Sequence, residues 1–311
     1  MNLTTRPPVT ASPASPPPQA AIPHRLRGRL VALRVDAAES LHATDKSVVL
    51  AGRWHGKPIV VKLLVTDDPY WVQRFNDEQA RYARLNVTPP PVRIARLLHA
   101  EEGLTILQRL PGTRLGNARY PDTVAADKVA QLLDTLDQLH SWRPGPGVLG
   151  DPQPITESQL VRHTASGQLT TADLTAVTGL LERMRRDGVG TRPEHGDVLA
   201  ANVLAAVDGP AGLVDLEHLG RHTPGIDWAL LYLLLGPGAP AVRPLVLQQV
   251  TRQEMQVPFA LNLMLLACRE WSIHHGWGGE PWETTRPTLR GNLEHARDYL
   301  HAIAAANGLH A

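Results

Sequence analysis

Three oxygen-bearing side chains stand at short spacings in the middle of the chain. Asp197 follows His195 and Gly196, Asn202 comes five residues after Asp197, and Asp215 comes eighteen after it. Phosphoryl transfer needs a carboxylate that orients or accepts the proton of the attacking hydroxyl, together with Mg²⁺ to neutralise the phosphates. Carboxylate and amide oxygens are ligands that Mg²⁺ prefers. The spacing therefore predicts a phosphotransferase, with Asp197 as base and Asn202 and Asp215 as metal ligands.

The elements around these residues would bring them together. The apolar runs 203–205 and 213–214 are separated by Asp208-Gly209-Pro210, a strong turn signal. We expect two short paired strands, because this pattern is typical of a hairpin. Such a hairpin places Asn202 and Asp215 at neighbouring strand ends.

The spacing resembles the catalytic loop and metal-binding aspartate of the eukaryotic-like kinase superfamily. The version of this loop with glycine after the histidine, here Gly196, resembles that of the aminoglycoside phosphotransferase/choline kinase family, a group of small-molecule kinases. Residues 214–220 (Val-Asp-Leu-Glu-His-Leu-Gly) lead through Pro-Gly-Ile at 224–226 into Asp-Trp-Ala at 227–229. That family runs similarly from an Ile-Asp-Trp-Glu-like segment into Asp-Leu-Ala. The resemblance covers residues 29–300 and is tight over 195–229.

The resemblance implies roles for residues in the larger half of the chain. His195 would fix the catalytic loop by hydrogen bonding, and Asp227 would bind backbone amides of that loop. Asp227 also opens a helix, where an aspartate is a good cap. Glu217 could face the acceptor site or form an ion pair, and both alternatives stay open.

The family fold is an α+β, bilobal, protein-kinase-like fold. We expect a disordered Pro-rich tail at 1–24, an antiparallel nucleotide-binding lobe at 25–110 and a mainly helical catalytic and acceptor-binding lobe at 111–311. Strands are predicted at 29–35, 47–54, 59–65, 92–98 and 104–110. Helices are predicted at 171–186, 228–235, 244–255, 259–275 and 287–305. A further helix is predicted before these, and its apolar stripe ends at His140.

The resemblance also assigns the nucleotide-binding residues. Lys62, on a strand rich in β-branched residues, would reach the α- and β-phosphates. Glu78, in a helix that starts at Asp68-Pro69, would pair with Lys62, and Asp77 is the nearest competitor. Backbone groups between Gln108 and Leu110 would bind adenine.

The segment 37–47, read as the loop between the first two strands, contains no glycine. Glycine lets backbone amides approach phosphates closely. Hydroxyl groups of Ser40, Thr44 and Ser47 are the predicted substitutes. Both ATP and GTP remain candidate donors.

Composition narrows the classes of partner. The net charge of +1 gives no electrostatic case for nucleic acid or an anionic membrane. The single cysteine suits a reducing, cytoplasmic location. We expect His274 and His275 to lie on a helix surface. The sequence is equally compatible with a monomer and with a homodimer.

The acceptor is the least constrained part of the prediction. A protein kinase is disfavoured, because only eleven residues separate Asp215 from Asp227. Residues 241–311 hold six acids and six arginines, which is a weak basis for binding polycationic drugs. Glu270 and Trp271 could still form an aromatic–acidic acceptor pocket, so choline-like amines, sugars and aminoglycosides all stay open. A nucleotide-binding pseudokinase or scaffold is the alternative outside enzymes.

Overall fold

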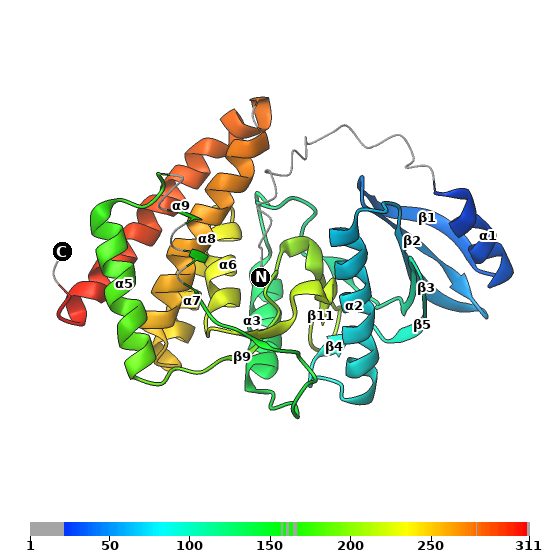
Figure 1. The fold of residues 1–311 in the computed structure, drawn as a ribbon, viewed down its shortest axis with the longest axis horizontal. Coiled ribbons are helices and arrows are strands. Elements are labelled where there is room, and N and C mark those ends of the chain that lie inside the picture. Colours follow the sequence, from blue (N-terminus) through cyan, green and yellow to red (C-terminus); the bar gives the residue numbers. More distant parts are fainter. Residues whose placement is uncertain (1–21, 157, 160–161, 164–166, 278, 310–311) are drawn as a thin grey trace.

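The computed structural model describes residues 22–156, 158–159, 162–163, 167–277 and 279–309. A small lobe built on a five-stranded sheet adjoins a larger, mainly helical lobe (Figure 1). This arrangement confirms the predicted bilobal kinase-like fold. Of the predicted tail, residues 1–21 lie outside the described residues, and His24 already begins a helix.

The sheet of the small lobe is antiparallel, in the order β1-β2-β3-β6-β5. One face carries a row of buried aliphatic side chains, among them Leu50, Val61 and Ile106. These pack against Leu26 and Leu30 of the first helix. The elements are α1 (His24–Ala32), β1 (Asp36–Ala43), β2 (Ser47–Trp54), β3 (Lys57–Leu64), β5 (Leu97–Glu101) and β6 (Leu104–Gln108).

The first predicted strand, 29–35, is wrong. Residues 24–32 form α1, because Leu26 and Leu30 lie four residues apart and so share one helical face. The first strand is instead β1, within the segment that was read as a loop. A short apolar run such as 30–33 fits a strand or a helix equally well from sequence alone.

Helix α2 (Pro69–Val87) begins as predicted. The side chain of Asp68 accepts a hydrogen bond from Tyr70 N at 2.9 Å and caps the helix, with proline in its first turn. Phe75, Tyr82 and Leu85 are buried on one face, and Glu78 is buried with them. The helix therefore presents one acidic side chain to the space beside the sheet.

The remaining strands form two small sheets. One has the order β4-β11-β10-β7, and Val203 pairs with Leu213 in the predicted hairpin. The predicted strand 92–98 divides, because 93–94 (β4) pairs with β11 and only the later part pairs with β6. The members are β4 (Arg93–Ile94), β7 (Thr113–Arg114), β10 (Val203–Ala205) and β11 (Gly212–Leu213), then β8 (Pro152–Gln153), β9 (Arg192–Glu194) and β12 (Gly220–His222) of the other sheet.

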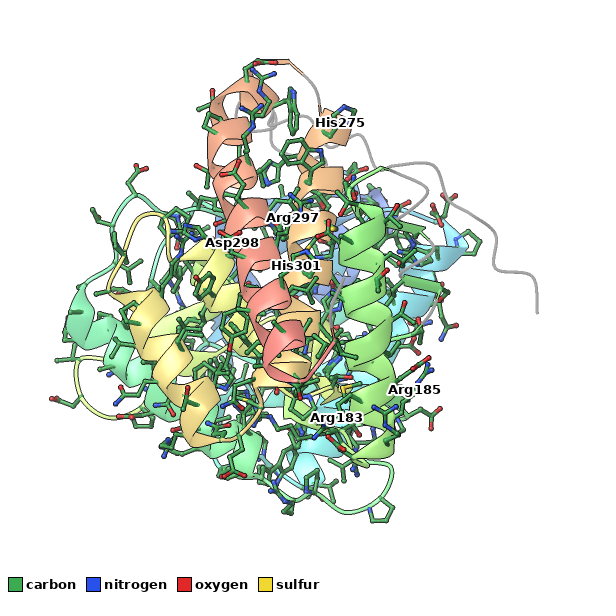
Figure 2. All side chains as sticks on the ribbon, turned by 90° about the vertical axis from the view of Figure 1, so that its left-hand side faces the viewer. Arg183, Arg185, His275, Arg297, Asp298 and His301 are labelled. Atoms are coloured by element: carbon green, nitrogen blue, oxygen red, sulfur yellow. The ribbon has the colours of Figure 1, made fainter. Side chains whose placement is uncertain are left out.

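The large lobe contains helices α3 (Ala126–Ser141), α5 (Thr171–Arg186), α6 (Ile226–Leu234), α7 (Val242–Arg252), α8 (Gln256–Trp277) and α9 (Gly279–Ala306). Figure 2 shows α9, which carries Arg297 and His301, beside α5. Both side chains bind the buried carboxylate of Asp173 on α5, at 2.9 Å from Arg297 Nε to Oδ2 and 2.9 Å from His301 Nε2 to Oδ1. This contact fastens α9 to the start of α5.

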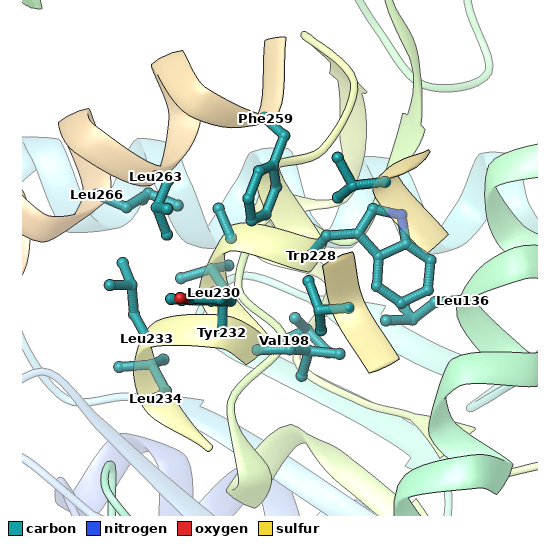
Figure 3. Close-up of a cluster of buried hydrophobic side chains, with 14 of the residues drawn as sticks. Leu136, Val198, Trp228, Leu230, Tyr232, Leu233, Leu234, Phe259, Leu263 and Leu266 are labelled. Carbon is teal, nitrogen blue, oxygen red and sulfur yellow. The ribbon is translucent and has the colours of Figure 1, made fainter. Parts of the chain in front are cut away.

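Helix α6 is the centre of the core. Every residue from Asp227 to Leu234 is buried, and Trp228, Leu230 and Leu233 belong to one buried cluster with Phe259 and Leu263 of α8 (Figure 3). A helix that is apolar on all sides must lie inside the protein. It gives the catalytic loop a rigid neighbour. His274 is buried and not on the surface as predicted, whereas His275 is exposed.

Among the helices of the described residues, none is both long and apolar enough to cross a membrane.

Candidate active site

The catalytic loop joins β9 to β10 through a short 3-10 turn, η1 (Ala200–Asn202). Asn202 Nδ2 donates to the backbone oxygen of Asp197 at 2.9 Å and lies 3.4 Å from its Oδ2. Leu199 N donates to the same backbone oxygen at 2.8 Å. These bonds fix the half-buried carboxylate of Asp197 at the loop tip. They also leave the amide oxygen of Asn202 available as a ligand.

His195 connects this loop to the strand that leads to Asp215. Its Nε2 donates to Val214 O at 3.0 Å, because a carbonyl can only accept. Its Nδ1 then faces Asp197 N at 3.4 Å as an acceptor. The fully buried imidazole therefore positions two neighbouring segments, and its ring nitrogens are occupied by backbone groups.

Gly196 is required by space as well as by conformation. Its φ is +78°, a region in which side chains are strained. A Cβ atom here would lie 2.7 Å from His218 O and 3.0 Å from His222 Nε2. Glycine therefore lets the catalytic loop pack directly on the segment that follows Asp215.

Asp227 binds two backbone amides of the loop. Its Oδ2 accepts from His195 N at 2.7 Å and its Oδ1 accepts from Gly196 N at 2.8 Å. His140 Nε2 lies 3.0 Å from Oδ2. The carboxylate is fully buried, so these bonds form in a low-dielectric interior where leaving them unmade is costly.

Glu194 extends this network. It accepts from Gly225 N at 2.8 Å and Asp227 N at 3.0 Å, and Arg192 Nε lies 2.6 Å from its Oε1. Burial alone would raise the pKa of Glu194, but the charges and hydrogen bonds of His140 and Arg192 lower it well below its usual range. The sequence reading placed His140 in the core only and assigned nothing to Glu194. A buried acid directly before the histidine of the motif was the available signal.

Lys62 lies between two carboxylates that come from different lobes. Its Nζ is 2.6 Å from Glu78 Oε2 on α2 and 3.2 Å from Asp215 Oδ1 beyond β11. Burial acts to lower the pKa of Lys62, but the charges of Asp215 and Glu78 raise it well above its ordinary value. Lys62 therefore stays a cation and links the strand, the helix and Asp215. Asp77 is exposed and binds Gln73, so Glu78 is the partner.

Asp215 has an unusual backbone. Its φ of 60° and ψ of 65° are left-handed, a conformation that aspartate tolerates better than most residues. The following turn, η2 (Leu216–His218), is fixed to α2 because Arg81 Nη1 donates to Leu216 O at 3.1 Å and to Glu217 O at 2.9 Å. Strained residues of this kind gather at functional sites.

Glu217 forms ion pairs. Its Oε1 lies 3.2 Å from Arg74 Nη2 and 3.2 Å from His218 Nε2. Burial would raise the pKa of Glu217, but the hydrogen bond from His218 and the charges of Arg74 and Lys62 lower it to about 2. Of the two alternatives for Glu217, the structure shows the ion pair.

A group of oxygen atoms beside Lys62 fits a hard divalent cation. Ligand atoms of Glu78, Asp215 and Glu217 all lie within 4.8 Å of one another, and the amide oxygen of Asn202 is free of the bonds its nitrogen makes. Mg²⁺ takes oxygen ligands from one or two carboxylates together with substrate phosphates. Asp215 is the most exposed of the three acids, with 40% of its side chain accessible. The donor set therefore fits Mg²⁺.

The predicted hinge leaves β6 at Gln108. The amides of Gln108 and Arg109 donate to Arg96 O at 2.8 Å and Pro58 O at 3.2 Å. Those two amides are therefore engaged in holding the hinge. Leu110 follows, and its side chain lies against Gly212 of β11. Of the predicted range, Leu110 is the residue whose amide stays a candidate for adenine.

The predicted phosphate loop is wrong in its position. Ser40 lies in β1 and Ser47 opens β2, so the turn between them is only 44–46. Ser40 is paired with Leu50 and shares its sheet face, which is the face that packs on α1. Ser47 pairs with Leu64, on the face that carries Lys62. Side-chain alternation thus directs Ser40 away from the nucleotide side.

The predicted acceptor residue Glu270 belongs to a charge pair that no sequence pattern indicated. Arg119 holds the buried carboxylate of Glu270 by two bonds, of 2.6 Å from Nε and 2.7 Å from Nη2. Arg269 Nη2 lies 3.2 Å from the same carboxylate. Burial would raise the pKa of Glu270, but Arg119 and Arg269 lower it to about 2. Trp271 packs edge-on against Trp282 of α9, with ring centroids 5.2 Å apart.

Comparison with known proteins decides the family. A sequence model of the phosphotransferase enzyme family, APH, matches residues 38–257, more than two-thirds of the chain. The chain belongs to this family. Membership confirms the predicted resemblance and the predicted enzyme class, a phosphotransferase of the small-molecule kinase kind. No curated protein sequence matches the chain.

Solved structures share the fold of this phosphotransferase at low sequence identity. The ADP-bound aminoglycoside phosphotransferase APH(2'')-Ib has a TM-score of 0.60 at 14% identity, over 88% of this chain and 98% of that one. Choline kinase LicA from Streptococcus pneumoniae has 0.57 at 16%, over 87% and 98%. A GDP complex of aminoglycoside 2'-phosphotransferase-IIIa has 0.55 at 15%, over 92% and 99%. At such identities the likeness establishes the fold.

Proposed function

We propose that this phosphotransferase moves the γ-phosphoryl group of ATP or GTP, as the Mg²⁺ complex, to a hydroxyl group of a small molecule. The observation that carries the proposal is the pairing of Lys62 Nζ with Glu78 at 2.6 Å and with Asp215 at 3.2 Å, which joins β3, α2 and the segment after β11. The similar structures bound to ADP and to GDP support a nucleotide donor of either kind. The single cysteine, buried and unpaired, fits a cytoplasmic setting.

Each residue of the site has a defined task in this reaction. Asp197 orients the acceptor hydroxyl and takes up its proton as the oxygen bonds to the γ-phosphorus, while the bond from that phosphorus to the bridging oxygen breaks and the nucleoside diphosphate leaves. Asp215 and the amide oxygen of Asn202 would hold Mg²⁺, and a bound Mg²⁺ would supply positive charge against the phosphates. Lys62 contacts the α- and β-phosphates as a point charge that Glu78 keeps in place. Asp227 and His195 hold the loop in place by hydrogen bonds, so that Asp197 stays positioned during the transfer.

The length of the segment between the two acidic motifs supports a small acceptor. Residues 216–225 are taken up by η2, by β12 and by a short turn into α6. β12 is paired on both sides, with β8 and β9. This segment is part of the folded lobe and offers no long surface on which a peptide substrate could dock.

Charge at the acceptor side supports an acceptor that is not a polycation. The carboxylate of Glu270 is already compensated by Arg119 and Arg269, so it presents no free negative charge to an amine. Aminoglycosides and choline are substrates named for the similar structures, and both are cationic. We propose that neutral or acidic hydroxyl compounds are better acceptors here.

The test is consumption of ATP and GTP by the purified protein in Mg²⁺, with a panel of sugars, hydroxy acids, choline and aminoglycosides. Asp197→Asn should lower acceptor-stimulated turnover by about 10²- to 10⁴-fold while nucleotide binding persists. Near-native turnover of Asp197→Asn would remove the base assignment. A clear preference for aminoglycosides would contradict the proposed acceptor class.

A further inference from the structure

Three charged side chains of α2 reach the segment that begins at Asp215. Arg74, Glu78 and Arg81 stand one helical turn apart, so they share one side of the helix. Glu78 acts through Lys62, whose Nζ lies 3.2 Å from Asp215 Oδ1. The two arginines contact the residues that follow Asp215 directly. The helix therefore contacts the turn after Asp215 as well as the lysine that binds its carboxylate.

Arg81 binds the backbone of this turn, η2. Its Nη1 donates to Leu216 O at 3.1 Å and to Glu217 O at 2.9 Å. A guanidinium nitrogen of this kind carries two N–H groups, so each carbonyl can accept one of them. A single side-chain atom therefore fixes two successive peptide units directly after Asp215.

The charge of Arg81 is kept in place at an electrostatic cost. Burial and the charge of Arg84 lower the pKa of Arg81 more than the charges of Glu78 and Asp77 raise it. The hydrogen-bond acceptors found for Arg81 among the described residues are backbone oxygens of η2, with no carboxylate bound to it. Its contribution is therefore the geometry of η2 and not the balance of charge.

The backbone of Asp215 needs support from both sides. Its left-handed conformation persists in a residue other than glycine only where the surrounding structure fixes it. On the preceding side, Val214 N donates to Asn202 O at 3.0 Å and Val214 O accepts from His195 Nε2 at 3.0 Å. On the following side, Arg81 holds the first two carbonyls of η2.

Arg74 holds the side chains of the same turn. Its Nη2 lies 3.2 Å from Glu217 Oε1 and 3.1 Å from His218 Nε2. Side chains can rotate, whereas the carbonyls that Arg81 binds belong to the backbone that directs Asp215. Arg81 is therefore the arginine whose loss would act most directly on Asp215.

We propose that Arg81 is a positioning residue of the metal site, which fixes the turn after Asp215 and thereby the direction of the Asp215 carboxylate. This inference rests on the proposed function, because it takes Asp215 to be a ligand of Mg²⁺. Arg81 acts through the backbone of η2 and is not itself a ligand. A helix of the small lobe thus determines the geometry of a metal ligand that lies after β11.

The test measures ADP affinity by calorimetry over a series of Mg²⁺ concentrations. Arg81→Gln should raise the Mg²⁺ concentration needed for tight ADP binding by about 10- to 100-fold, the usual effect of removing a group that orients a metal ligand. ADP affinity in a chelator should be unchanged, because Lys62 and Glu78 stay paired. Arg81→Lys should recover part of the loss, because an ammonium group can still donate to one carbonyl.

Arg84→Gln is the matched control. Arg84 lies on the same helix, is also half-buried and also donates to a backbone oxygen, from Nε to Val148 O at 3.1 Å. Val148 is not part of the turn after Asp215, so this control should keep the native Mg²⁺ dependence. Urea unfolding of every variant separates a loss of folding from a loss of metal binding.

Each result has a distinct meaning. A folded Arg81→Gln variant with the Mg²⁺ dependence of the native protein would overturn the positioning role and leave the proposed function intact. If Arg81→Gln does not fold, a native Mg²⁺ dependence in Arg81→Lys would overturn it in the same way. An equal loss in Arg84→Gln would also overturn it, because the docking of α2 as a whole would then be responsible. ADP binding by the native protein that does not depend on Mg²⁺ would overturn the proposed function, and this inference with it.

Discussion

The floor and the roof of the active site are built by opposite means. Under the catalytic loop, Asp227, Glu194 and His140 are fully or almost fully buried and bind backbone amides and one another. In the small lobe, the roof comprises His42 and the turn 44–46, which are exposed or half-buried and make few contacts, chiefly within the turn and from Lys46 to Trp71. The floor depends on a closed network, whereas the roof depends on a few separate contacts.

The difference shows where sequence constrains structure most. A buried carboxylate must have all its partners in place, so the floor needs particular residues at particular spacings. The roof is held by hydrogen bonds within the turn and by the contact of Lys46 with Trp71, so it places fewer demands on residues elsewhere in the chain. We therefore expect substitutions in the floor to cost much stability and substitutions in the roof to cost little.

The largest expected effect is that of Asp227→Ala. The substitution leaves the amides of His195 and Gly196 without acceptors and removes one partner of a buried ion pair, which should cost about 3–5 kcal/mol of unfolding free energy. The control Asp208→Ala, at an exposed turn, should stay within about 0.5 kcal/mol. Urea unfolding measures both. Equal stabilities would mean that the floor is not a network.

Glu270→Gln should come next and should depend on pH. The pKa of Glu270 falls from 4.5 to about 2 on folding, so its contribution is fully present above pH 4.5 and is lost as pH falls toward 2. The shift corresponds to about 3 kcal/mol. Urea unfolding at neutral pH and at a series of lower values should show the gap between native and variant narrowing below pH 4.5. A constant gap would contradict the ion-pair account.

Gly196→Ala should cost about 1–3 kcal/mol, because a Cβ would lie 2.7 Å from His218 O in a left-handed backbone. It should also slow phosphoryl transfer by displacing Asp197. The control is Gly190→Ala, where a Cβ meets no atom within 4 Å. Thermal unfolding and turnover, measured side by side, test the prediction, and a variant as stable as the control would show that the loop can shift freely.

The smallest expected effect belongs to the roof. Lys46→Gln removes the contact with Trp71 and should cost about 0.5–1 kcal/mol. Lys57→Gln, at the other end of the same sheet, is the exposed control. A loss of several kcal/mol for Lys46→Gln would show that the roof is as integrated as the floor, and the comparison would fail.

The same contrast explains what sequence predicted. The spacing of Asp197, Asn202 and Asp215 predicted the hairpin that joins them, because a tight motif and a turn signal agreed. Helix α2 and its cap at Asp68 also followed from local rules. These features depend on residues that are close together in the chain.

The roof and the acceptor side could not be predicted in this way. Residues 24–32 carry an apolar run that is compatible with a strand, and only packing against the sheet selects the helix. The partner of Glu270 is Arg119, which lies 151 residues away. Bulges in β1 determine that His42 shares the sheet face of Lys62 and Ser40 does not, and no local signal marks those bulges. These features depend on contacts between residues that lie far apart in the chain.

The most direct test of the account is a calorimetric titration of the purified protein with ADP, once in Mg²⁺ and once in a chelator. Asp215 is the residue on which the proposed site depends, so the same titration is made with Asp215→Ala. We predict binding that Mg²⁺ strengthens by about tenfold or more, equivalent to about 1.4 kcal/mol, and a loss of that gain in the variant. Binding that is equally tight with and without Mg²⁺, or a variant that keeps the full Mg²⁺ dependence, would contradict the assignment of the cleft as a metal–nucleotide site.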